Sequence, residues 1–158
     1  MKLKLVKGAN QEILRTRCDE VLDFDSDLEK LVESMKKMMV KSRGVGIAAP
    51  QVDINARIFI FTKNVDREDV GNQIVEAINP VVLNVSTDTI LGEEGCLSLP
   101  GVYGNVRRPL DCMVSYFNAK GEKITENLRG FDARVFLHEL DHLNGVLFID
   151  KLEDQIAM

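Results

Sequence analysis

Residues 138–142 read His138-Glu139-Leu140-Asp141-His142, which is the pattern H-E-x-x-H. On a helix, positions four apart lie one above the other, so both imidazoles can reach a single metal ion. Glu139 lies about 100° further round the helix, where its carboxylate can hold and deprotonate a metal-bound water. The pattern therefore predicts a helix over about 132–143 that carries two ligands and a general base. The alternative is a buried helix with two hydrogen-bonded histidines and an incidental glutamate.

A third ligand has to be another residue type, because His138 and His142 are the only histidines of the chain. The extended pattern H-E-x-x-H-x-x-G-x-x-H requires a histidine where this chain has Phe148. Cys96, in the polar run Glu93-Glu94-Gly95-Cys96-Leu97-Ser98, is the leading candidate. A thiolate there completes a Cys/His/His site with a fourth position open for water. Upstream aspartate and glutamate residues remain alternative ligands.

A glycine-containing segment, Gly44-Val45-Gly46-Ile47-Ala48-Ala49-Pro50-Gln51, fits the loose dinucleotide fingerprint G-x-G-x-x-A. It follows a predicted helix instead of a strand, which disfavours a dinucleotide-dependent enzyme. The glycines instead allow close backbone approach at a cleft, with Gln51 offering its amide to a bound carbonyl. A purely structural turn is the alternative.

The remaining pattern predicts an α+β fold. A helix is expected over 27–40, with Ser26 and Glu29 at the spacing of a capping box. Strands are expected over 57–62, over 74–85 as two short pieces broken at Asn79-Pro80, and over 112–117 and 123–128 as a hairpin. No repeat or linker divides the sequence, so residues 1–158 are expected to form a single domain.

Composition narrows the class of protein. The chain has 158 residues, 45% of them hydrophobic, and a formal net charge of −5, which argues against nucleic acid as the main ligand. No apolar run is long enough to cross a membrane, and the first residues alternate charged with apolar side chains, so a cytoplasmic protein is expected. Three cysteines cannot all pair with one another, and Cys18 and Cys112 are expected to be packing residues.

Taken together, Gly44–Gln51, Glu94-Gly95-Cys96-Leu97-Ser98 and His138–His142 resemble the three signature motifs of the peptide deformylases, in order and in spacing. The resemblance covers nearly the whole chain. It implies a hydrolase that removes the formyl group from the N-terminal formyl-methionine of nascent polypeptides and releases formate. It also implies antiparallel β-sheets wrapped around a central H-E-x-x-H helix, with an N-terminal helix.

The resemblance also implies a role for each matching residue. Cys96, His138 and His142 would hold one divalent metal ion per chain, with Glu139 as general base and acid for a metal-bound water. Gln51 and the backbone N–H of Leu97 would stabilise the oxyanion, Gly46 would bind the peptide backbone, and Val45, Phe131 and Val135 would line the methionine pocket. Iron(II) is the expected native metal, and zinc, nickel or cobalt can be found in preparations.

The absence of a long insertion between the motifs resembles the bacterial and organellar type, so a bacterial cytoplasm is expected. Leu137 occupies a position where relatives often have glutamine. None of the roles above is assigned to this residue, so the difference does not affect them. Work near the ribosome exit region is expected too; only 16 residues follow His142, where some relatives continue into a C-terminal helix, which affects accessory contacts such as this docking and leaves the chemistry intact. A metallopeptidase and a non-catalytic, metal-stabilised peptide-binding module remain as alternative classes.

Overall fold

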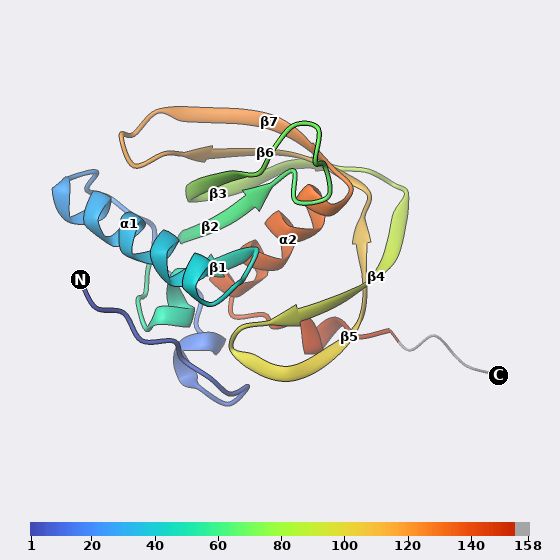
Figure 1. Cartoon of the computed structure of the whole chain (residues 1–158), viewed down its shortest axis with the longest axis horizontal. Helices are drawn as coiled ribbons and strands as arrows, with labels where there is room; N and C mark the ends of the chain where they lie inside the picture. The colour runs from blue at the N-terminus through green and yellow to red at the C-terminus, as the bar shows by residue number, and fades with distance from the viewer. Residues whose placement is uncertain (154–158) are drawn as a thin grey trace.

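The computed structural model describes residues 1–153 (Figure 1). Within them lie the α-helices α1 (Ser26–Lys41) and α2 (Phe131–Leu143) and the short 3-10 helices η1 (Glu12–Arg15), η2 (Ala49–Val52) and η3 (Phe148–Lys151). The strands are β1 (Gly46–Ala48), β2 (Ile58–Lys63), β3 (Gln73–Val85), β4 (Thr89–Cys96), β5 (Leu99–Pro109), β6 (Asp111–Phe117) and β7 (Lys123–Arg129). None of the helices in this part of the chain is both long and apolar enough to span a bilayer.

Two antiparallel sheets carry the site. One has the strand order β1-β2-β3-β6-β7, and the other is the pair β4-β5. Helix α2 lies between them and packs against β1 and β2 on one side and β5 on the other (Figure 1). Phe136 of α2 meets Phe59 and Phe61 of β2 edge to face, with ring centroids 4.9 and 5.4 Å apart. The expected α+β class with antiparallel sheets is confirmed.

Helix α1 covers the other face of β1 and β2. Its apolar stripe, Leu28, Val32, Met35 and Met39, is buried against Ile47, Ile58 and Ile60. The predicted capping box is wrong. Asp25 is the N-cap residue, and its carboxylate accepts a hydrogen bond from the N–H of Leu28 at 3.0 Å, while Ser26 is already helical. The helix begins one residue earlier than the capping-box spacing indicated because aspartate caps as well as serine does.

Strand β3 is continuous, where the sequence predicted two strands broken at Asn79-Pro80. The pairing with β6 skips from Ile78 to Val81, so the chain absorbs the proline in a bulge and stays in the sheet. Asn79 takes a left-handed backbone conformation, with φ of 51°, and its side chain pairs with both backbone polar groups of Val21. The hairpin predicted over 112–117 and 123–128 is confirmed as β6 and β7.

Candidate active site

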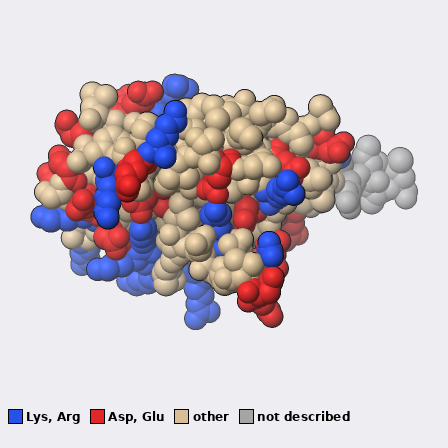
Figure 2. All heavy atoms as spheres, turned by 90° about the horizontal axis from the view of Figure 1, so that it is seen from above, with Lys and Arg blue, Asp and Glu red and all other residues tan. Residues whose placement is uncertain are grey.

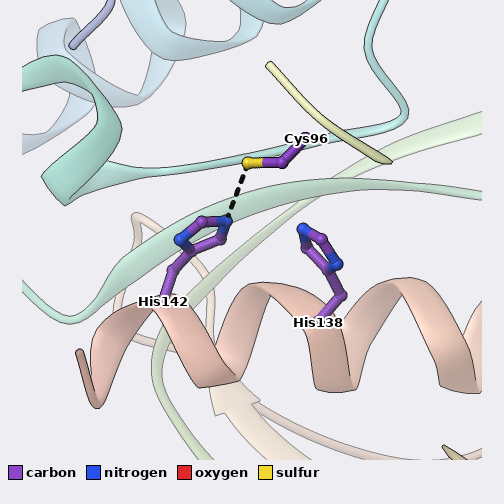
Figure 3. A group of neighbouring side chains, drawn as sticks. All are labelled: Cys96, His138 and His142. Carbon is purple, nitrogen blue, oxygen red and sulfur yellow. Dashed lines mark hydrogen bonds between the residues drawn. The ribbon is translucent and has the colours of Figure 1, made fainter. Parts of the chain in front are cut away.

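Cys96, His138 and His142 come together between α2 and the end of β4 (Figure 3). Their candidate ligand atoms all lie within 4.8 Å of one another, and Cys96 Sγ lies 3.4 Å from His142 Nε2. The two histidines project from one face of α2, as their four-residue spacing requires. Cys96 comes from the end of β4, in the two-stranded sheet.

The donor set suits a divalent metal ion. Ligands at about 2.3 Å for sulfur and about 2.0 Å for nitrogen on a tetrahedral centre lie about 3.5 Å apart, close to the observed sulfur–nitrogen distance. His142 is buried, which lowers its pKa well below 6.5 and keeps it in the neutral form that binds metals. Its Nδ1 atom is buried without a hydrogen-bond partner in the described chain, as is Oε1 of Glu139. Nε2 and not Nδ1 of His142 faces Cys96, so the atom that bears on the site is Oε1 of Glu139, a buried acceptor in the lining of the cleft that a ligand can pair.

Glu94 fixes the orientation of His138, a role that the sequence analysis missed. His138 donates from Nδ1 to Glu94 Oε1 at 2.8 Å, which leaves its Nε2 facing the cysteine side. The same carboxylate accepts from Arg108 at 2.9 Å at each oxygen and from Arg134 at 2.6 Å. Burial opposes ionisation of Glu94, but hydrogen bonds from Arg108 and His138 outweigh it and lower the carboxyl pKa from 4.5 to about 2. A sequence signal existed, because residues two apart on a strand share a face, and Glu94 stands two before Cys96.

Glu139 is buried beside the three candidate ligands without being one of them. Its Oε2 atom lies 3.9 Å from His138 Nε2, and burial raises its pKa from 4.5 to about 7. Gly46 of β1 lies directly against this carboxylate, so that a side chain at position 46 would occupy the same space. The backbone of the Gly44–Gln51 segment thus lies in close contact with the candidate base, as expected from its two glycines.

The Gln51 side chain is fully enclosed next to Cys96. Its Oε1 accepts from the N–H of Ala48 at 2.9 Å, and its Nε2 donates to Ser98 Oγ at 3.1 Å and approaches Cys96 Sγ at 3.4 Å. Leu97 lies in the turn between β4 and β5, and its N–H has no hydrogen-bond partner among residues 1–153. Both donors therefore lie beside the candidate metal centre, and the amide of Gln51 is held by Ala48 and Ser98.

A cleft of about 440 Å³ opens over these residues. It is lined by all four residues predicted to bind substrate, Val45, Gly46, Phe131 and Val135, and by Gln51, Cys96, Leu97, His138 and Glu139. Val45 and Phe131 are part-exposed at its mouth, at 37% and 36%, while Val135 is buried. The other two cysteines lie elsewhere, because Cys18 and Cys112 are buried in the core around Phe59 and Phe61.

Comparison with known proteins identifies the family. Residues 3–157 match the family described as polypeptide deformylase. The chain belongs to the peptide deformylase family. A peptide deformylase of Thermotoga petrophila is 46% identical over 140 residues, which cover 89% of this chain and 81% of that protein.

Solved peptide deformylases share the fold. The enzyme of Thermotoga maritima superposes with a TM-score of 0.89 at 41% identity, over 98% of this chain and 99% of that one. A class I type b peptide deformylase of Acinetobacter baumannii, solved with bound Met-Ala-Ser, gives a TM-score of 0.88 at 36% identity, over 96% and 99% of the two chains. Peptide deformylases are enzymes that remove formyl groups, so the predictions of the family and of an enzyme are confirmed.

Proposed function

We propose that this chain hydrolyses the N-formyl group of N-terminal formyl-methionine in nascent polypeptides and releases formate, with Cys96, His138 and His142 as metal ligands. The observation that carries this proposal is the position of Glu139, buried beside the Cys/His/His cluster at the floor of an apolar cleft. The Acinetobacter baumannii relative with bound Met-Ala-Ser, a peptide that begins with methionine, supports the substrate class.

A divalent metal ion bound by Cys96, His138 and His142 supplies Lewis acidity and lowers the pKa of a water molecule. Glu94 supports this site by holding His138 through Nδ1, and such outer partners tune both the orientation and the basicity of a ligand. We assign iron(II) as the native ion on the resemblance to the family. Metal analysis of protein purified without oxygen tests this assignment, and stoichiometric zinc with full activity would contradict it.

Glu139 moves the protons. Its carboxylate takes a proton from the attacking water as the oxygen bonds to the formyl carbon. The same group then gives that proton to the amide nitrogen as the carbon–nitrogen bond breaks, so that formate and a free N-terminal amine leave. A buried carboxyl with a pKa of about 7 suits both steps, because it accepts and releases a proton near neutral pH.

Gln51 and the N–H of Leu97 stabilise the oxyanion that forms on the formyl oxygen. The N–H of Leu97 is unpaired within the described chain, and one N–H of the Gln51 amide faces Cys96 Sγ. The bonds with Ala48 and Ser98 hold this amide beside the candidate metal centre, so the donor is in place before the oxyanion forms. Preorganised donors of this kind are worth several kcal/mol in the transition state.

The peptide backbone lies along the free edge of β1. Thr62 donates its N–H to Val45 O at 2.8 Å, so the carbonyl of Val45 is directed toward β2. Successive residues of an antiparallel strand turn their backbone polar groups to opposite sides, so those of Gly46 face the cleft. A substrate can therefore add as a strand at Gly46, while its methionine side chain enters the apolar region lined by Val45, Phe131 and Val135.

Formate release separates the proposal from its rivals. We expect formyl-Met-Ala-Ser to release formate, while Met-Ala-Ser and acetyl-Met-Ala-Ser give no product. Cleavage of the unformylated peptide between residues would identify a metallopeptidase instead. Binding without turnover of any peptide, in protein with full metal content, would identify a peptide-binding module.

Three further predictions from the sequence complete the proposal. We propose that residues 1–158 form a single domain, that the protein is located in a bacterial cytoplasm, and that it acts near the ribosome exit region. The last five residues, 154–158, lie outside the described part of the chain.

A further inference from the structure

The cleft has one open end along the edge of β1. Beyond Gly46, the N–H of Ala48 is bonded to Gln51 Oε1, and all four residues of η2 are buried. The N-terminal segment also covers this end, where the N–H of Val6 donates to Gln51 O at 2.7 Å. A peptide that reacts beside Glu139 must therefore leave in the opposite direction, past Val45 and Gly44.

Arg43 stands at that exit. It lines the cleft, three residues before Gly46, which corresponds to about 10 Å along an extended chain. Its backbone is fixed in the left-handed conformation, with φ of 59°, and the neighbouring N–H of Gly44 donates to Met39 O at 3.0 Å. Gly44 lies against the Leu97 side chain, so its neighbour Arg43 borders the cleft on the side of Leu97.

The Arg43 guanidinium is exposed and has no ion-pair or hydrogen-bond partner in the described residues 1–153. Arg134, the other arginine of the cleft, is buried and paired with Glu94. The exposed acid of the cleft, Glu93, follows Gly92, which lies against the Arg134 side chain. Acidic and basic side chains both spread over the face of the molecule that Figure 2 shows.

We infer that Arg43 makes this enzyme select for substrates with an aspartate or glutamate at the third or fourth residue, counted from the formyl-methionine. The inference rests on the proposed function, because it takes the formyl group to react beside Glu139. A peptide strand that pairs with Gly46 and runs toward Arg43 places its third and fourth residues next to Gly44 and Arg43.

The selectivity should appear mainly in KM. Arg43 lies far from the reacting carbon, so it attracts a carboxylate equally in the bound substrate and in the transition state. An exposed charge pair gives a modest effect, and we expect about a three- to tenfold difference in kcat/KM between an acidic and a basic residue. The difference should shrink at high salt, because the Debye length falls from about 10 Å at 0.1 M to about 3 Å at 1 M.

Two peptide series test the inference: formyl-Met-Ala-Xaa-Ala-Ser and formyl-Met-Ala-Ala-Xaa-Ser, with Asp, Asn or Lys as Xaa. The wild-type enzyme should prefer Asp over Asn and Asn over Lys in at least one series. Arg43→Gln should bring the Asp-to-Lys ratio close to one, and Arg43→Glu should reverse it. Lys37→Glu is the matched control, since it makes the same change of charge at an exposed residue of α1 that does not line the cleft, and it should keep the wild-type ratio.

Equal turnover of all peptides by the wild-type enzyme would overturn the role of Arg43 and leave the proposed function intact. A wild-type ratio in Arg43→Gln, or an equal loss of the ratio in Lys37→Glu, would also overturn it. If Arg43→Glu fails to fold, the Arg43→Gln comparison decides alone. No formate from the Asn peptides would instead contradict the proposed function itself.

Discussion

Gly46 and Glu139 are in direct contact. A Cβ atom added at position 46 would overlap the Glu139 carboxylate and displace it. Gly46→Ala should therefore push the candidate base out of place while leaving the Cys/His/His cluster unchanged. We expect kcat to fall by about 10² or more, as for the loss of a positioned acid–base group, with metal content retained. Steady-state kinetics together with metal analysis measures both.

Gly44→Ala is the control for this substitution. An added Cβ at position 44 would meet Cδ1 of Leu97 at 2.7 Å, and that flexible side chain can move aside. The loss of activity should be much smaller than for Gly46→Ala. Equal losses of kcat in the two variants would show that activity depends on the backbone of the cleft in general and not on the contact between Gly46 and Glu139.

Gln51→Ala should lower kcat by about 10² to 10³ with little change in KM, because an oxyanion donor acts mainly in the transition state. It should also lower the free energy of unfolding by about 1–3 kcal/mol, because the buried N–H of Ala48 loses its acceptor. Ser98→Ala removes one partner of the amide but keeps the donor, so its kcat should fall less. A change confined to KM would make Gln51 a substrate-positioning residue.

Glu94→Gln should weaken both the fold and the metal site. The substitution removes the only carboxylate partner of the buried Arg134 guanidinium among residues 1–153 and one of the two of Arg108, which keeps Asp141, and breaking a buried ion pair costs about 3–5 kcal/mol. Metal affinity should fall about 10- to 100-fold, because Nδ1 of His138 loses its charged acceptor and the imidazole becomes a weaker ligand. Urea unfolding of the metal-free protein and competition with a chelator measure the two effects.

Glu93→Gln provides the matched control, since Glu93 is the exposed neighbour of Glu94 on the same strand. Its stability should change by less than about 0.5 kcal/mol, and its metal affinity should stay as in the wild type. If Glu94→Gln behaves like Glu93→Gln in both measurements, the orientation of His138 does not depend on Glu94.

The three thiols should differ in reactivity. Cys18 and Cys112 are buried, and burial raises the pKa of both, to about 11 for Cys112. In native, metal-free protein, iodoacetamide should therefore modify Cys96 first, because it opens to the cleft. Bound metal should protect Cys96, and mass spectrometry of the digested protein identifies the modified peptide. Faster modification of Cys112, or no protection by metal, would argue for another ligand.

Much of this site could be predicted from local sequence. The four-residue spacing of the two histidines on a helix, and the chemical need for a third donor, led to Cys96 across 42 residues of sequence from His138 (138 − 96). The support around them was harder to predict. Arg108, Arg134 and Glu94 lie on three different elements, and no local pattern shows that strands β4 and β5 bring them together over α2.

The two wrong predictions, the helix cap and the strand break, have a common physical cause. In each case two alternative local structures have similar free energies. Asp25 and Ser26 are both good N-cap residues, and in the structure the Asp25 carboxylate takes the N–H of Leu28. Asn79-Pro80 ends many strands, but here the hydrogen bonds between Asn79 and Val21 hold a bulge and the strand continues. A local choice between two caps decided the first case, and a contact between segments far apart in the sequence decided the second.

The central claim is that Glu139 moves the protons while Cys96, His138 and His142 hold the metal. Glu139→Gln keeps the shape of the side chain and removes its basicity. We therefore expect one metal ion per chain in this variant, together with a loss of formate release from formyl-Met-Ala-Ser of about 10⁴ or more, since one residue serves both proton transfers. A Glu139→Gln enzyme that holds its metal and keeps more than about a tenth of the wild-type turnover, far above the range for a general base, would contradict the account.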